Sequence, residues 1–303
     1  MRHFLDPSDL TPKELTHLLQ EAGRLKSARQ RGEHPPLLAG RVLGLVFEKP
    51  SLRTRVSFET AAAQLGGSSI FLAGKEAGLG SRESVPDFAR TMSQYVDAMV
   101  LRTFSHATVQ TFAEHATCPV INGLSDLHHP CQALADVFTV QEVFGKVAGR
   151  KIVFVGDGNN VARSLAICCG KLGISLVLAA PEGYGFDEPF LQALRQQVPE
   201  ANVSQVRDPA EAVRSADVIY TDVWASMGQE EELDQRRERF ADYQVNAALL
   251  AQAPPHARVM HCLPARRGEE ATSDVLDGDR SIIFQQAGNR LHAQKALLKW
   301  LLR

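Results

Sequence analysis

The chain has 303 residues, of which 44% are hydrophobic and 22% are charged, and its formal net charge at neutral pH is -2. This length suits two domains better than one small core, and the composition is typical of a globular protein. The near-neutral charge argues against nucleic acid or an acidic membrane as a partner, so an anion site must be built from local arginines.

We expect a cytoplasmic protein that does not enter a membrane. No apolar run is long enough to cross a bilayer, and the first residues lack the apolar core of a signal peptide. The number of cysteines is odd and none forms a C-x-x-C pair, which fits a reducing compartment. They are Cys118, Cys131, Cys168, Cys169 and Cys262.

The first half of the chain alternates helices and strands. A capping box at Thr11-Pro12-Lys13-Glu14 predicts the start of the first helix. The elements expected next are a buried strand at 42–47, a polar loop at 49–54, a helix at about 56–65, a helix at 86–95, a strand at 98–102, a helix at 109–115, a strand at 120–122 and a long helix from His129-Pro130 to about 144. This alternation predicts a parallel sheet covered by helices.

A second alternation follows a predicted boundary at Gly149-Arg150. Strands are expected at 151–155, 176–180, 203–206, 218–221, 259–261 and 282–284, and helices at 161–172, 188–197 and 209–215. The last helix, at about 291–302, is expected to return to the first domain. The predicted fold class is therefore α/β with two domains, each a parallel sheet flanked by helices. The first comprises residues 1–147 and 289–303, and the second comprises residues 148–288.

The pentapeptide Ser51-Leu52-Arg53-Thr54-Arg55 lies between a predicted strand and a predicted helix. The first turn of a helix presents unpaired N–H groups and the positive end of the helix dipole, and both attract an anion. Ser51 and Thr54 add hydroxyl donors, and Arg53 adds a planar fork suited to phosphate oxygens. The pattern indicates a phosphate site. An ordinary polar loop with surface arginines is the alternative.

Three more polar side chains are candidates for the same anion. Arg102 ends a predicted strand, and ligands of parallel sheets collect beyond the carboxyl ends of strands. His129 and Gln132 share one side of a first helical turn, where their N–H groups can hold a carbonyl oxygen that gains negative charge. A surface ion pair and a plain helix cap are the respective alternatives. A metal site is a weaker alternative, because the candidate ligands lack regular zinc-ligand spacing. These ligands would be His128, His129, Cys131 and Cys262.

The second half also places polar groups after its predicted strands. Asn159 and Asn160 follow Gly156-x-Gly158, which resembles the start of a dinucleotide fingerprint, but Val161 occupies the place of the third glycine. Amide groups at that point suit an amino-acid substrate better than a pyrophosphate.

Two further strand ends carry reactive groups. Asp222 can bind an ammonium group, and the Cys262 thiol can be a nucleophile, a proton relay or only a packed residue.

Taken together, these motifs resemble the aspartate/ornithine carbamoyltransferase family over nearly the whole chain. They are Ser51-Leu52-Arg53-Thr54-Arg55, Leu101-Arg102-Thr103, His129-Pro130-Cys131-Gln132, Asp157-Gly158-Asn159-Asn160, Ser226-Met227-Gly228, His261-Cys262-Leu263-Pro264 and Asn289-Arg290-Leu291-His292, in the family's order. The resemblance implies carbamoyl transfer from carbamoyl phosphate to an amine. The Ser-Met-Gly loop implies L-ornithine as the acceptor, with citrulline and phosphate as products in arginine metabolism.

The resemblance also implies residue roles, a homotrimer or a multiple of trimers, no cofactor and no metal. The implied carbamoyl phosphate site comprises Ser51, Leu52, Arg53, Thr54, Arg102, His129, Gln132, Cys262, Leu263 and Arg290. The implied ornithine site comprises Asn160, Asp222, Ser226 and Met227. The residues implied in catalysis are Arg102, His129, Asp222 and Cys262. The alternatives are a related enzyme acting on another amine, a nucleotide-dependent dehydrogenase and a non-catalytic amino-acid sensor.

Two positions depart from the family pattern. Leu52 replaces a threonine of the phosphate loop, and its side chain cannot donate a hydrogen bond, so we expect modestly weaker phosphate binding. Gly78 lies in a loop that often carries Gln or His and reaches a neighbouring subunit. Either another residue such as Arg82 takes that role, or the shared contact is weaker.

Overall fold

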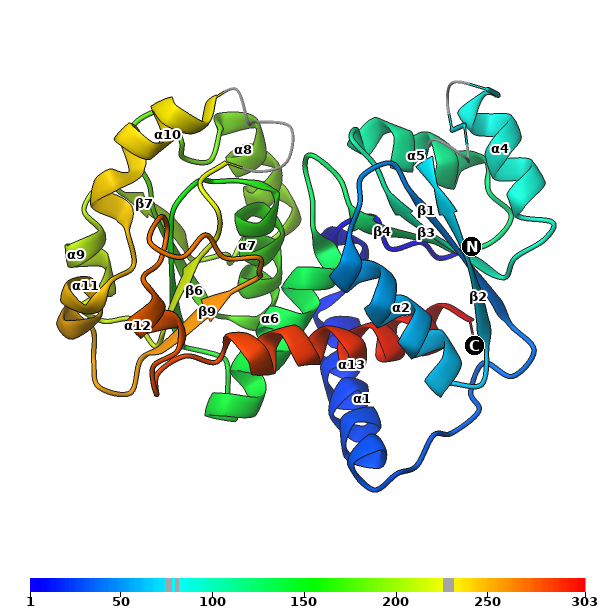
Figure 1. The fold of residues 1–303 in the computed structure, drawn as a ribbon, viewed down its shortest axis with the longest axis horizontal. Coiled ribbons are helices and arrows are strands. Elements are labelled where there is room, and N and C mark those ends of the chain that lie inside the picture. Colours follow the sequence, from blue (N-terminus) through cyan, green and yellow to red (C-terminus); the bar gives the residue numbers. More distant parts are fainter. Residues whose placement is uncertain (75–77, 80–81, 226–231, 303) are drawn as a thin grey trace. The chain divides into compact units, whose positions relative to one another are not determined.

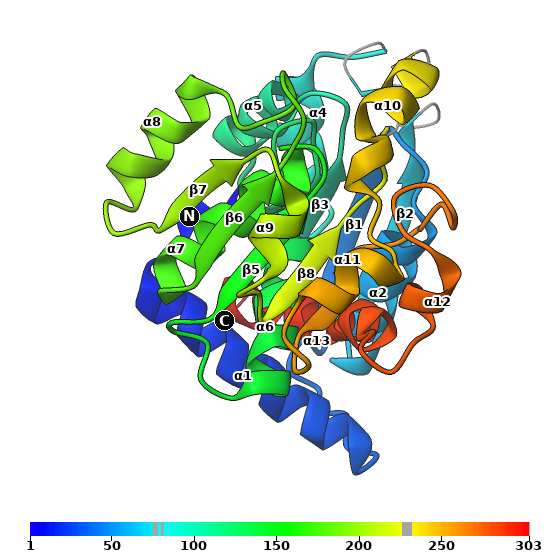
Figure 2. The same ribbon diagram turned by 90° about the vertical axis from the view of Figure 1, so that its left-hand side faces the viewer.

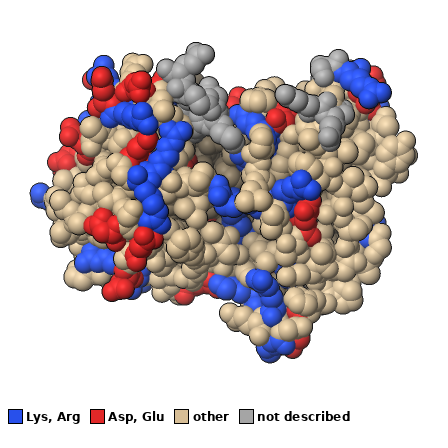
Figure 3. All heavy atoms as spheres, viewed as in Figure 1, with Lys and Arg blue, Asp and Glu red and all other residues tan. Residues whose placement is uncertain are grey.

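The computed structural model describes residues 1–74, 78–79, 82–225 and 232–302. The chain forms two compact units. Unit 1 comprises Met1–Phe138 and Asn289–Arg303, and unit 2 comprises Thr139–Gly288. No helix within the described ranges combines the length and the apolar character needed to span a bilayer. On the face shown in Figure 3, basic and acidic side chains are interspersed with uncharged surface.

Unit 1 is a parallel four-stranded sheet in the order β2-β1-β3-β4, with helices packed against it (Figure 1). Its strands are β1 Val42–Phe47, β2 Ser68–Ala73, β3 Ala98–Arg102 and β4 Val120–Leu124. Its helical elements before the crossing to unit 2 are η1 Pro7–Asp9, α1 Pro12–Gln30, α2 Leu52–Gln64, α4 Val85–Met92, α5 His106–His115 and α6 Pro130–Phe144. The predicted parallel sheet is confirmed.

The start of α2 corrects one expectation, because residues 52–54 form the first helical turn instead of a loop. Ser51 is the N-cap, and its Oγ accepts a hydrogen bond from the Thr54 amide at 3.4 Å. A serine cap satisfies one of the amide groups that a helix leaves unpaired at its start. The helix therefore begins at Leu52, four residues before the predicted start.

Strand β2 was not predicted from the sequence. It lies at the edge of the sheet, and its side chains are exposed or only partly buried. Its Ile70 is 48% exposed. Edge strands lack the continuous apolar run that identifies a central strand such as β1.

Unit 2 is a parallel five-stranded sheet in the order β7-β6-β5-β8-β9, and Figure 2 labels β7, β6, β5 and β8. Its strands are β5 Lys151–Val155, β6 Ser175–Ala179, β7 Val203–Val206, β8 Val218–Thr221 and β9 Arg258–His261. Its helical elements are α7 Asn160–Leu172, α8 Glu188–Gln197, α9 Pro209–Val213, α10 Leu233–Phe240, η3 Ala241–Tyr243, α11 Ala247–Gln252 and α12 Ser273–Leu276. The strand order reverses between β5 and β8, and ligands of such sheets bind beyond the carboxyl ends at that point.

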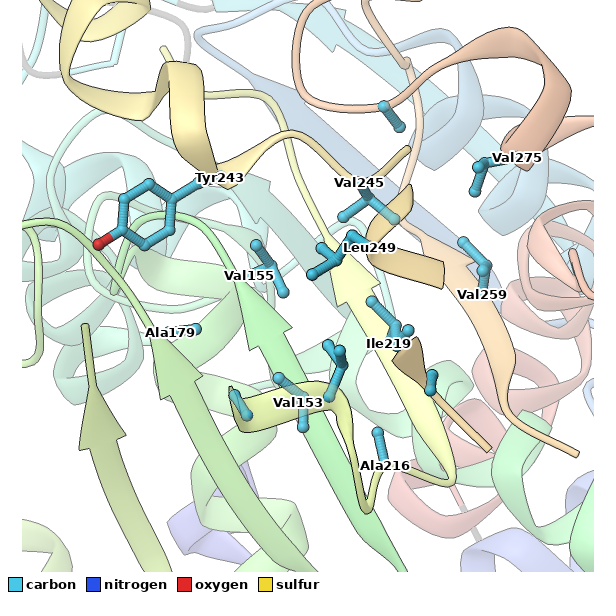
Figure 4. Close-up of a cluster of buried hydrophobic side chains, with 14 of the residues drawn as sticks. Val153, Val155, Ala179, Ala216, Ile219, Tyr243, Val245, Leu249, Val259 and Val275 are labelled. Carbon is cyan, nitrogen blue, oxygen red and sulfur yellow. The ribbon is translucent and has the colours of Figure 1, made fainter. Parts of the chain in front are cut away.

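One face of this sheet carries an apolar core. Val153, Val155 and Ile219 of the strands lie in one cluster with Val245, which precedes α11, and with Leu249 of α11 (Figure 4). All are buried. This core fixes the strands whose carboxyl ends carry the candidate site of unit 2.

The expected strand at 282–284 is wrong, because α13 Ile283–Leu302 begins there. Only an isolated bridge joins Ser281 to Val259. Ile283 is buried whereas Phe284 is 68% exposed. A short apolar run cannot distinguish a strand from the first turn of a buried helix. Residues of α13 from Asn289 onward belong to unit 1, which confirms that the C-terminal helix returns to the first domain.

Candidate active site

Four elements of unit 1 bring the predicted phosphate-binding residues together. Ser51 and Thr54 begin α2, Arg102 ends β3, and His129 precedes α6. Arg290 of α13 joins them, since its Nη2 donates a hydrogen bond to Thr54 Oγ1 at 2.7 Å. Residues that are up to 236 positions apart in the chain thus share one site.

Positive charge is concentrated at this site. Arg102 is only 5% exposed, and burial, followed by the charges of Arg290 and Arg53, lowers the pKa of its guanidinium to about 10. Its Nε is buried and has no hydrogen-bond partner within the described part of the chain. Burial, followed by the positive charges of Arg290 and Arg102, holds the pKa of the His129 imidazole well below its usual value. The site therefore offers three guanidinium groups beside a neutral imidazole, an arrangement suited to an anion.

Gln132 is oriented by a buried carboxylate. Its Nε2 donates a hydrogen bond to Asp136 Oδ1 at 2.8 Å, and its Oε1 is buried without a partner among the described residues. This orientation offers an acceptor oxygen for an N–H group of a ligand, while the second N–H of Nε2 is the donor that the sequence predicts.

The zinc alternative lacks structural support. Burial raises the pKa of the Cys131 thiol to about 12, so the thiolate that zinc requires is disfavoured. Within the described ranges, the groups of potential metal ligands that lie close together do not include the proposed set. They are Asp6, His106 and His128, and Asp222, His261 and Cys262.

Asp222 is the centre of the second candidate site, which lies in unit 2. It follows β8, and its carboxylate accepts three hydrogen bonds. Asn159 Nδ2 donates to Oδ2 at 2.9 Å, while Cys262 Sγ and the Val223 amide donate to Oδ1 at 2.9 and 2.8 Å. Asn159 also caps α7 through Oδ1. The strand ends of β5, β8 and β9 are thereby linked through one carboxylate.

Two of the predicted ornithine contacts, Ser226 and Met227, lie outside the described residues. The third, Asn160, is the first residue of α7 and follows the cap residue Asn159 directly. Asn160 is partly exposed. The structure therefore places the start of α7, which carries Asn160, next to the loop that carries Asp222, because the Asn159 cap donates a hydrogen bond to Asp222.

A family model of the carbamoyl-phosphate-binding domain of aspartate/ornithine carbamoyltransferases matches residues 2–142, and the corresponding Asp/Orn-binding domain model matches residues 148–301. The chain belongs to the aspartate/ornithine carbamoyltransferase family. An ornithine carbamoyltransferase of Anoxybacillus flavithermus is 50% identical over 303 residues, covering 99% of this chain and 96% of that protein. One from Syntrophus aciditrophicus is 51% identical over 301 residues, covering 99% of each.

The fold comparison agrees with this family membership. The solved ornithine carbamoyltransferase of Pyrococcus furiosus matches with a TM-score of 0.96 and 48% identity, covering 99% of this chain and 97% of that structure. The enzyme from Thermus thermophilus matches with a TM-score of 0.90 and 43% identity, covering 100% and 99%.

The two departures from the family pattern have different structural settings. The Leu52 side chain is 76% exposed at the first position of α2, so it does not occupy the space beside Thr54. Gly78 has φ +63°, and a Cβ there would lie 2.6 Å from the Cβ of Arg82. Both its conformation and its neighbour therefore favour glycine at this position of the carbamoyltransferase.

Sequence reasoning missed a buried pair next to Cys262. His261 and Glu270 are fully buried, with His261 Nε2 2.9 Å from Glu270 Oε1. The Leu263 amide donates to His261 Nδ1 at 2.8 Å, so the proton lies on Nε2 and is donated to Glu270. Leu263 has φ +58°, a conformation that costs a non-glycine residue about 1 kcal/mol. The hydrogen bond from the Leu263 amide to His261 stabilises that conformation. The pair of His261 and Glu270 could not be predicted, because no spacing rule links a histidine to a glutamate nine residues later.

Proposed function

We propose that this protein is an ornithine carbamoyltransferase, which transfers the carbamoyl group of carbamoyl phosphate to the side-chain amine of L-ornithine and yields L-citrulline and phosphate. The observation that carries the proposal is the group of three guanidiniums beside a neutral imidazole at the start of α2. The identity of about 50% to ornithine carbamoyltransferases over the full chain supports the same reaction.

In this proposal, unit 1 binds carbamoyl phosphate. The phosphate group lies at the start of α2, where Ser51, Arg53, Thr54 and the amide of Leu52 donate to its oxygens. Arg290 donates to the same anion and supports Thr54. The site thus stabilises the phosphate as it leaves.

Three side chains act on the carbamoyl group. Arg102 and the neutral His129 donate to its carbonyl oxygen, which makes the carbon more electrophilic. A donor placed for such developing charge lowers the activation free energy by roughly 3 kcal/mol. Gln132 Oε1 accepts from the carbamoyl NH₂ group, since its amide is held by Asp136.

Unit 2 binds ornithine through Asp222, with Asn160, Ser226 and Met227 as further predicted contacts. A carboxylate offers about four acceptor positions, and three donors already occupy Asp222, so one position on Oδ2 can accept an ammonium N–H of the substrate. The roles of Cys262 and Leu263 toward carbamoyl phosphate stay predictions of the family resemblance.

The attacking amine must be unprotonated. An alkyl amine has a pKa of about 10.4, so roughly one molecule in 10³ is the free base near neutral pH. The amine nitrogen forms a bond to the carbamoyl carbon, and the bond from that carbon to the phosphate oxygen breaks. The departing phosphate takes the proton released by the amine, while the hydrogen bond between Cys262 and Asp222 keeps the carboxylate oriented.

We also propose a cytoplasmic homotrimer. The apolar side chains Leu52, Val56 and Ile70 are 76%, 50% and 48% exposed, which supports burial against other copies of the chain. The five cysteines all lie in the described ranges and none of them forms a disulfide bond, which supports a reducing compartment. Light scattering on the purified protein should give three times the 33.2 kDa chain mass, and a monomer would contradict the assembly.

One assay separates the candidate activities. Purified protein is incubated with carbamoyl phosphate and, in turn, ornithine, putrescine, aspartate and N-acetylornithine, while ureido product and phosphate release are measured. We expect equimolar citrulline and phosphate with ornithine. Product with another amine alone would identify a related carbamoyltransferase. Ornithine binding by calorimetry without product would identify a sensor, and NAD binding would favour a dehydrogenase.

A further inference from the structure

Arg236 is a buried arginine on a largely exposed helix. Helix α10 is rich in charge, but Arg236 is only 5% exposed and shares the buried face of α10 with Phe240, four residues later. In the sequence it is one of several arginines in a charged run, and nothing there distinguishes it from Arg237. Its burial indicates a specific role.

The Arg236 guanidinium binds the loops that follow two central strands. Its Nη1 donates to Asp157 Oδ2 at 2.6 Å, just after β5, and to the Trp224 carbonyl at 2.9 Å, just after β8. Its Nε donates to Glu232 Oε2 at 2.9 Å, and the guanidinium lies 5.0 Å from the centre of the Tyr184 ring. One side chain thus joins both loops to α10.

These loops carry the groups proposed to bind ornithine. Asp157 lies two residues before Asn159, which donates to Asp222, and Trp224 lies two residues after Asp222. Burial and the charge of Asp222 raise the pKa of Asp157, while the hydrogen bond from Arg236 acts in the opposite direction. Arg236 therefore compensates the repulsion between two neighbouring carboxylates.

Helix α10 is attached to unit 2 mainly by apolar packing, not by Arg236. Phe240 is fully buried, and its ring packs against the rings of Tyr184, Trp224 and Tyr243. A buried ion pair often adds little net stability compared with apolar side chains of similar volume, because both charges must be desolvated. The geometry of the loops, rather than attachment of the helix, is what Arg236 specifically determines.

We infer that Arg236 is a positioning residue for the amino-acid substrate, which holds the loops after β5 and β8 so that Asp222 and Asn160 are presented correctly. This inference rests on the proposed function. Without the guanidinium, Asp157 and Asp222 repel each other and the two loops lose their common anchor. Ornithine binding should suffer, whereas carbamoyl phosphate binding, assigned to residues of unit 1, should not.

The test compares Arg236→Gln with Arg237→Gln, an exposed neighbour that pairs with Asp234 and Glu269. We expect Arg236→Gln to raise the KM for ornithine by about 30-fold, the effect of losing roughly 2 kcal/mol of charge-assisted hydrogen bonding. The KM for carbamoyl phosphate should change by less than about twofold, and Arg237→Gln should leave both values near wild type, as surface pairs contribute little. Arg236→Lys should restore part of the ornithine affinity.

A double-mutant cycle with Asp157→Asn gives an independent readout. Asp157→Asn alone should raise the KM for ornithine. The KM of the double variant should be no higher than that of the more impaired single variant. If Arg236→Gln does not fold, the rise in KM for Asp157→Asn still tests the inference. An unchanged KM for ornithine with a lowered Tm, or equal losses for both substrates, would overturn it. Wild-type protein that forms no citrulline would instead refute the proposed function.

Discussion

Substitution of Arg102 by methionine should stabilise the ligand-free protein while it weakens the site. Arg102 is 5% exposed, so solvent screens its charge very little. Lowering its pKa to about 10 corresponds to a penalty of about 3 kcal/mol for keeping the guanidinium charged in the folded chain. Because the folded-state pKa lies below that of the unfolded chain, the penalty is fully present below pH 10 and declines only at higher pH.

Methionine keeps the length of the side chain and removes the charge. We expect the Tm of the ligand-free variant to rise by a few degrees, since each kcal/mol corresponds to about 2–4 °C in a domain of about 150–250 residues. Loss of one donor to the carbonyl oxygen should lower kcat by about 10²–10³. Carbamoyl phosphate should raise the Tm of the wild type much more than that of the variant, because less ligand binding energy is available.

Thermal unfolding with and without carbamoyl phosphate, together with steady-state kinetics, measures both effects. Arg41→Met is the control, because Arg41 pairs with Asp97 next to the amino end of β1, away from the strand end that carries Arg102. The control should lose at most about 1 kcal/mol of stability and keep its activity. A lower ligand-free Tm for Arg102→Met, combined with a wild-type response to carbamoyl phosphate, would refute the reasoning.

Three further predictions follow from the two sites. Leu52→Thr should lower the KM for carbamoyl phosphate by about twofold to fivefold, because it restores one neutral hydrogen-bond donor, and an unchanged KM would show that this position does not reach the phosphate. Asp222→Asn should raise the KM for ornithine at least about 100-fold, through the loss of a charge-assisted hydrogen bond, without affecting that for carbamoyl phosphate; equal effects on both substrates would contradict the assignment. Because burial and the charges of Arg290 and Arg102 hold the pKa of His129 well below its usual value, the Kd for carbamoyl phosphate, measured by calorimetry without ornithine, should show no titration of this imidazole between pH 6 and 8. A titration in that range that disappears in His129→Gln would contradict the neutral imidazole.

The central strands were predictable because their burial gives continuous apolar runs. Strand β3 at Ala98–Arg102 and strand β5 at Lys151–Val155 were predicted with the correct ends. The capping box at Thr11 was confirmed as well, because its pattern lies within four residues. Helices α10, α11 and α12 were not predicted, since they are short and their stability comes from contacts such as the burial of Phe240.

Some residues of the two candidate sites were predictable from the sequence and others were not. Arg102 and Asp222 were predictable because they lie at strand ends, and Ser51 was predictable because it lies between a strand and a helix start, where ligands of parallel sheets bind. Arg236 and Asp157 are separated by 79 residues, and His261 shows no sign of its buried partner Glu270. Such pairs depend on the packing of distant segments, which the local sequence does not encode.

Carbamoyl phosphate labelled with ¹³C at the carbonyl carbon tests the central claim most directly. NMR spectra of the purified protein with this compound and L-ornithine follow the labelled atom during the reaction. We predict that the label passes into the ureido carbon of citrulline, with one phosphate released for each citrulline, and that Arg102→Met slows this transfer. Label that appears only as bicarbonate or cyanate, at the rate seen without protein, would contradict carbamoyl transfer by this chain.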